Sequence, residues 1–204
     1  SDGRKVIFED LNGGPWSGII CFDTVAANIQ PLPIGRRIRL TGTIAEYGDG
    51  IEDGNVTEIF TTQSILPFEI NPVVPVDTIH TGDLRDPLTA EQWGGVWVEI
   101  LDATVIRDDL DYGGWTIDDG TGEIKIGTNS AHPSLTHGNW EGWESPPVGT
   151  FVKSIRGWVY NRHGFYHDST AFKLEPNYPS DITFGAGPPV ITMVERDPCV
   201  PMDG

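Results

Sequence analysis

Many short segments of the chain mix β-branched or aromatic residues with polar ones, and glycine, proline, asparagine or aspartate separates them. This pattern is typical of β-strands joined by turns. Helical periodicity is nearly absent, and the best helical candidate is one or two turns over Leu88–Trp93. Many strands without helical partners predict a barrel or a sandwich. The predicted strands are Lys5–Glu9, Ser17–Phe22, Arg37–Glu46, Val56–Thr62, Val96–Arg107, Gly114–Asp118, Glu123–Gly127, Phe151–Tyr160 and Ala171–Glu175.

The chain also contains an internal repeat of an acid–glycine hairpin, a spacer, a Pro-x-Gly turn and a long strand. In copy two, Gly120 and Gly122 suit a tight turn that needs positive φ. The two copies place these parts at Val6–Gly14, Pro33–Gly35 and Ile38–Ile44, and again at Trp115–Gly122, Pro147–Gly149 and Val152–Val159.

The motifs of copy two carry a resemblance to a known fold. Trp115–Ile124 looks like the hairpin of strands 2 and 3 in OB folds, including those of single-strand DNA-binding proteins, and Val148–Val152 with a following glycine looks like their fourth strand. With Thr81–Leu84 and Pro179–Ile182, copy two resembles the tandem OB-like modules of large bacterial secreted proteins, some of which are extracellular nucleases. The resemblance implies an all-β fold of two tandem OB-like β-barrels.

The repeat and the resemblance together predict three parts of the chain. Residues 1–75 form a first OB-like domain, residues 76–184 a second, and residues 185–204 an extended tail that resembles the first strand of an Ig-like domain. Copy two has the long strand Val96–Arg107 ahead of its hairpin, whereas copy one starts within a few residues of its hairpin. We therefore expect copy one to lack its first strand. The segment 67–87, proline-rich at its start, is expected to join the copies.

The charge and the cysteines narrow the choice of partners and compartment. Acidic residues outnumber basic ones 30 to 13, so the net charge of −17 opposes the binding of nucleic acid, and we expect none. No stretch of 18 apolar residues predicts a membrane span. Cys21 and Cys199 form no metal-binding motif; they are inert or they pair in an oxidising compartment, within or between chains. We expect an extracellular or cell-surface location.

The chain shows no recognisable catalytic motif, so we predict that it is not an enzyme. His163 and His167 are expected in a solvated hairpin turn rather than at a metal. Trp140 and Trp143 occupy a glycine-containing acidic loop and are weak candidates for stacking on sugar rings or docking on a protein. Two carboxylate-rich loops offer oxygen ligands for calcium, although neither has EF-hand spacing, and the sequence points to no other cofactor. Their residues are Asp49, Glu52 and Asp53 in one loop and Asp108, Asp109 and Asp111 in the other.

Two function hypotheses follow from these observations. The first is a non-catalytic structural subunit of a surface filament, sheath or adhesin stalk, which self-assembles head to tail. In this hypothesis the tail segment Val190, Ile191, Thr192, Met193 and Val194 supplies the strand missing from copy one of the next subunit, and Cys21 pairs with Cys199. The alternative is an OB-fold module that binds single-stranded nucleic acid or polysaccharide beside a nuclease or hydrolase domain.

Overall fold

The computed structural model describes residues 5–22, 35–48, 55–70, 73–110, 114–127, 143–161 and 172–187. Its architecture is mostly β, as the sequence predicts, with one short α-helix, α1, over Pro87–Ala90, followed by a 3₁₀ turn over Glu91–Trp93. The strands are β1 (Lys5–Glu9), β2 (Gly18–Phe22), β3 (Arg36–Tyr47), β4 (Val56–Ile70), β5 (Asp77–Thr78), β6 (Trp97–Leu110), β7 (Gly114–Asp118), β8 (Ile124–Ile126), β9 (Phe151–Asn161), β10 (Phe172–Glu175) and β11 (Ile182–Phe184).

Five strands of the second half close into a barrel. Strand β6 pairs antiparallel with β7, β7 with β8 and β10 with β9, while β8 and β10 are parallel. The antiparallel pairing of β9 with β6 closes the ring, and β5 and β11 extend the sheet beyond it. Strands β5 and β11 are two elements that the sequence pattern did not predict, because they are only two and three residues long.

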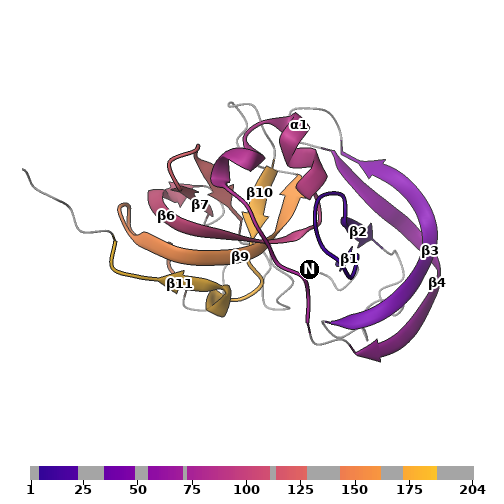
Figure 1. Ribbon diagram of the computed structural model, residues 1–204. Helices are drawn as coiled ribbons and strands as arrows, with labels where there is room; N and C mark the ends of the chain where they lie inside the picture. The colour runs from indigo at the N-terminus through magenta and orange to yellow at the C-terminus, as the bar shows by residue number, and fades with distance from the viewer. Residues whose placement is uncertain are drawn as a thin grey trace, which may run out of the picture.

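The first half of the chain forms a separate four-stranded sheet in the order β1-β2-β4-β3. The structure therefore confirms the predicted β class and one barrel, and it shows a curled sheet where a second barrel was expected (Figure 1). Strand β4 is longer than predicted and continues through Pro67 to Ile70. Proline is tolerated there because only β3 pairs with this part of β4 among the described residues.

The main hydrophobic core fills the closed barrel. Its members come from every barrel strand, and Trp115, Ile126, Leu174 and Val159 are each 0% exposed. Leu84 and Ala90 from the short helical turns complete the same core. Asp86 begins α1 because its side chain accepts a hydrogen bond from the Leu88 N–H, which is otherwise unpaired in the first turn.

A second, smaller cluster joins the curled sheet to the outside of the barrel. Ile20 and Val56 of the sheet are buried with Trp158 and Tyr160 of β9, and Trp158 meets Tyr160 edge to face at 5.0 Å. Gly18 is required at this junction, since a β-carbon there would lie 2.1 Å from the backbone of Gly95. The two sheets are therefore in direct contact, side by side, as Figure 1 shows.

Candidate assembly interface

The four strands of the curled sheet repeat the arrangement of four strands of the barrel. Strands β1 and β2 are antiparallel like β7 and β8; β2 and β4 are parallel like β8 and β10; and β4 and β3 are antiparallel like β10 and β9. In the barrel, β6 then joins β7 to β9. Among the described residues, nothing pairs with the outer edges of β1 and β3, and we call the position between these edges the strand gap.

The correspondence extends to individual residues. In the barrel, a row of paired side chains runs Trp115, Ile126, Leu174 and Val159 across four strands, and all four point into the core. The equivalent row in the curled sheet runs Val6, Cys21, Ile59 and Ile44. Because paired residues lie on the same face of a sheet, this apolar row marks the face that corresponds to the barrel interior.

The two rows differ in burial. Every residue of the barrel row is 0% exposed. In the curled sheet Cys21 is also fully buried, but Val6 and Ile59 are only half-buried and Ile44 is 59% exposed. Ile44 lies on β3, next to the strand gap, whereas its barrel counterpart Val159 is hydrogen-bonded to Gly95 and Val96, the two residues that precede β6. The curled sheet therefore presents an incompletely covered apolar face at an edge that lacks a described partner strand.

Strand β1 ends at Glu9, where the curled sheet meets the barrel. The Glu9 carboxylate accepts hydrogen bonds from the Trp97 backbone N–H and from the Ser17 hydroxyl, which is 3.4 Å from Oε1. Burial raises the pKa of Glu9 to about 7, and the nearby charge of Asp77 adds to the shift. Asp77 also accepts a hydrogen bond from the Gly14 N–H at 2.6 Å, so β5 holds the β1–β2 turn.

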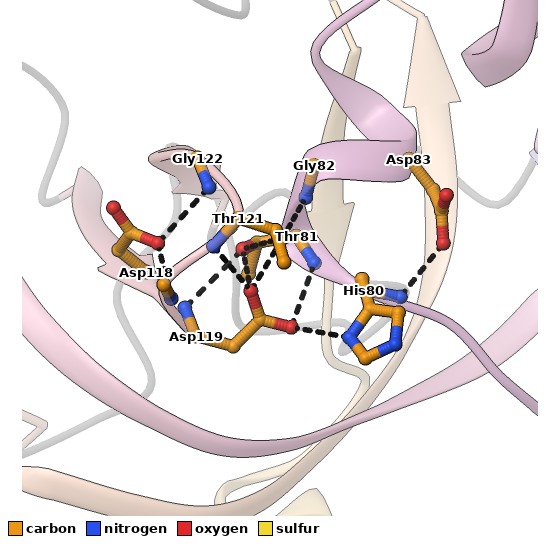
Figure 2. Close-up of polar contacts among 9 residues, drawn as sticks. His80, Thr81, Gly82, Asp83, Asp118, Asp119, Thr121 and Gly122 are labelled. Carbon is orange, nitrogen blue, oxygen red and sulfur yellow. Dashed lines mark hydrogen bonds and ion pairs between the residues drawn. The ribbon is translucent and has the colours of Figure 1, made fainter.

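The densest polar cluster joins the 3₁₀ turn Thr81–Leu84 to the β7–β8 hairpin (Figure 2). The Asp119 carboxylate accepts hydrogen bonds from the hydroxyl groups of Thr81 and Thr121, from both of their backbone N–H groups and from His80 Nδ1. Burial alone would raise the pKa of Asp119, but these hydrogen bonds outweigh it and hold the pKa well below its usual value. In the same hairpin Asp118 accepts from the N–H groups of Gly120 and Gly122, whose positive φ angles confirm the predicted turn.

This cluster has the form of a structural staple rather than of a catalytic relay. In a serine-type relay the hydroxyl nucleophile bonds to the histidine, whereas the Thr81 hydroxyl donates directly to Asp119 at 2.6 Å. His80 is largely exposed and contacts the cluster through Nδ1. The five donor groups that converge on Asp119 satisfy its carboxylate and connect two segments that are distant in the sequence.

Other features of the described residues also lack the geometry of an active site. A cavity of about 120 Å³ lies between the two sheets, which is smaller than ordinary ligand pockets of ~300–1,000 Å³. The Lys173 ammonium lies 2.7 Å from Glu175 Oε1, and both side chains are buried. Within the described ranges, no group of three or more histidine, cysteine, aspartate or glutamate residues is arranged to hold a metal ion.

The structure describes only some of the predicted site residues. Trp143 is partly buried against the barrel core and stacks on Phe184 at 6.4 Å. Asp108 and Asp109 lie on β6, where Asp108 accepts a weak hydrogen bond from the Val148 N–H, and Cys21 is buried on β2. The predictions for Trp140, Asp49, Glu52, Asp53, Asp111, Cys199 and Val190–Val194 concern positions outside the described residues, as do His163 and His167. The calcium and disulfide hypotheses stay predictions.

Comparisons with known proteins add no relative. No family model, no curated protein and no solved structure matches the chain. No helix in the described part of the chain is long and apolar enough to cross a membrane.

Proposed function

We propose that the protein is a non-catalytic, extracellular structural subunit that self-assembles into a surface filament, sheath or adhesin stalk. Strands β6–β10 form an OB-like barrel, and the curled sheet is a second OB-like barrel without its first strand. The observation that carries the proposal is the matched order and direction of four strands in the two sheets, with no counterpart of β6 among the described residues of the first.

An incomplete barrel of this kind can bind a strand of another subunit at its open edges. Unpaired N–H and C=O groups at a sheet edge accept a strand from another chain, and main-chain hydrogen bonds then supply affinity. The tail segment Val190–Val194 is rich in β-branched residues and is the strand that we propose to be donated. A contact between two different surfaces of identical subunits propagates head to tail into a filament. Cys21 and Cys199 lock the joint when they pair between chains.

The experiment compares the full chain with a chain that lacks residues 188–204. We expect the full chain to form filaments in electron micrographs and to elute as a concentration-dependent oligomer, and we expect the shortened chain to remain monomeric. Ladders on a non-reducing gel that collapse with reductant show the covalent joint. A full chain that stays monomeric at all concentrations, with or without reductant, contradicts the proposal.

A second candidate function is the binding of single-stranded nucleic acid, favoured by one observation. Arg37 and Arg39 lie at 6.0 and 5.9 Å from the centre of the Phe68 ring, which is 43% exposed on the β3–β4 hairpin. Cations beside an exposed aromatic ring are the elements of single-strand recognition. The net charge of −17 opposes this binding, so we expect negligible affinity for labelled single-stranded DNA at physiological salt. Tight, salt-sensitive binding in an anisotropy titration would support the second candidate instead.

A further inference from the structure

The barrel shows which strand the gap between β1 and β3 accepts. Strand β6 is antiparallel to both of its neighbours, β7 and β9. The corresponding neighbours of the strand gap are β1 and β3. A strand that completes the curled sheet in the same way must therefore run antiparallel to both.

The barrel also shows what side chains such a strand presents. Alternate residues of β6, including Val98 and Ile100, are 0% exposed because they enter the core. The strand gap offers Ile44 on one edge and Val6 and Phe8 on the other, all apolar and none of them fully buried. An incoming strand with apolar residues at alternate positions covers these three side chains.

The direction of the incoming strand has a consequence for the cysteines. An antiparallel strand leaves the strand gap beside Lys5, the first residue of β1, and Lys5 is paired with Phe22, the neighbour of Cys21. A parallel strand would leave beside Glu9, at the other end of the hairpin. Only the antiparallel direction therefore delivers the residues that follow Val194, including Cys199, to the Cys21 end of the sheet.

The position of Gly187, the last described residue, bears on whether the incoming strand comes from the same chain or from a second copy. Gly187 lies against Phe151, at the start of β9, whereas the curled sheet packs on Trp158 and Tyr160 near its end. Seven strand residues separate Phe151 from Trp158 by about 23 Å. The three residues from Gly187 to Val190 span at most about 11 Å. Figure 1 shows the same separation, with β11 on the side of the barrel away from β3 and β4.

We propose that the strand gap binds residues 190–194 of a second copy of this chain, antiparallel to β1 and β3, with alternate side chains of the donated segment packed on Val6, Phe8 and Ile44. This inference rests on the proposed function and adds the orientation of the donated strand and the acceptor residues of the joint. The donor's own strand gap is too far from its own tail, so every contact of this kind links two copies.

The test uses the full chain with Ile44→Asp, and Leu88→Asp as the matched control. Ile44 is 59% exposed and Leu88 is 86% exposed in the single chain, so neither substitution should unfold it. We expect Ile44→Asp to raise the concentration needed for assembly at least tenfold, since the aspartate is buried only in the joint, and Leu88→Asp to assemble like wild type. Circular dichroism and thermal melting of the dilute variants check that each remains folded.

A second pair of variants tests the donor. In a strand, Ile191 and Met193 face one side and Val190 and Val194 the other. The double variants Ile191→Asp/Met193→Asp and Val190→Asp/Val194→Asp should therefore weaken assembly unequally.

Each outcome is decisive. If wild type forms filaments and Ile44→Asp forms them equally well, this inference is wrong and the proposed function still stands. A loss of thermal stability of dilute, monomeric Ile44→Asp places a segment of the same chain over Ile44 and overturns it as well. Equal effects of the two double variants show that the tail is not a strand in the joint. A wild-type chain that never assembles overturns both the inference and the proposed function.

Discussion

The closed barrel and the curled sheet use the same strand order and reach different degrees of burial. Leu174 of β10 and Ile59 of β4 occupy equivalent positions, yet Leu174 is 0% exposed and Ile59 is only half-buried. One difference between the two surroundings is strand β6, which joins β7 to β9 and carries four core residues. One strand thus separates a packed core from a partly exposed apolar face.

The comparison also shows what holds the hairpins. In the barrel, Asp119 follows the last residue of β7 and connects the hairpin to the turn Thr81–Leu84 through five hydrogen bonds. In the curled sheet, Asp10 follows β1 at the equivalent position, and within the described ranges its side chain accepts from the backbone N–H and the side-chain amide of Asn12. The barrel hairpin is fixed to the rest of its domain, whereas the Asp10 bonds stay within a local turn.

We expect the largest change in the free energy of unfolding when the equivalent positions Leu174 and Ile59 are shortened to alanine. Leu174→Ala should reduce the free energy of unfolding by about 2–5 kcal/mol, because it leaves a cavity in a fully buried core. Ile59→Ala should cost less than half as much, since its side chain is only partly buried. Urea denaturation of the dilute, monomeric chain measures both, and Leu88→Ala, at an exposed site, should stay within about 0.5 kcal/mol of wild type. Equal losses at Leu174 and Ile59 would mean that the curled sheet is as tightly packed as the barrel.

The second largest change in the free energy of unfolding is expected at Asp119, compared with its counterpart Asp10. Asp119→Asn should destabilise the protein by about 2 kcal/mol at pH 7, because hydrogen bonds to a charged acceptor are lost or weakened. Asp10→Asn should cost about 0.5 kcal/mol or less, since Asp10 is exposed. The pKa of Asp119 is lowered in the fold, so its stabilisation is present above its ordinary pKa of 3.8 and is lost as the pH falls below it. A difference between wild type and Asp119→Asn that persists undiminished at pH 2 would contradict this origin.

Much of the β architecture could be predicted from local sequence, because turn residues and β-branched segments act over a few positions. The hairpin ending in Gly120 and Gly122 and the helical turns near Leu88 are examples. Strand ends were harder to predict: β4 continues through Pro67 because it pairs with β3, and no local signal reports that pairing. The repeat predicted two barrels, whereas the structure has one closed barrel and one curled sheet, because the pairing that closes a barrel is a property of the tertiary fold.

The polar contacts of the site were less predictable than the strands. The sequence places Asp119 in an acid–glycine turn, but its contacts with His80 and Thr81 join residues almost forty positions apart. Asp77 lies in a two-residue strand and gave no signal, although it contacts the Gly14 N–H across 63 positions. Exposure of Ile44 could not be read from its alternating pattern, because the same pattern in β9 produces a buried Val159.

The smallest effect concerns Glu9, where the two regions touch. Because its pKa is about 7 in the fold and 4.5 ordinarily, the folded chain holds a proton that the unfolded chain has released between these pH values. The free energy of unfolding therefore decreases as the pH rises from about 4.5 to 7, and the cost is complete above 7. Since Glu9 is only half-buried, solvent screening reduces the effect to about 1 kcal/mol.

Glu9→Gln removes this titration and keeps the shape of the side chain. We expect the variant to match wild type at pH 4.5 and to be more stable at pH 8, because glutamine places no charge beside Trp97 and Asp77. Thermal melting of dilute protein across this range measures the difference. The exposed Glu144→Gln, which has the same change of charge away from the junction, should show no such pH-dependent gain. If Glu9→Gln differs from wild type by the same amount at both pH values, the junction between curled sheet and barrel does not bury the Glu9 carboxylate.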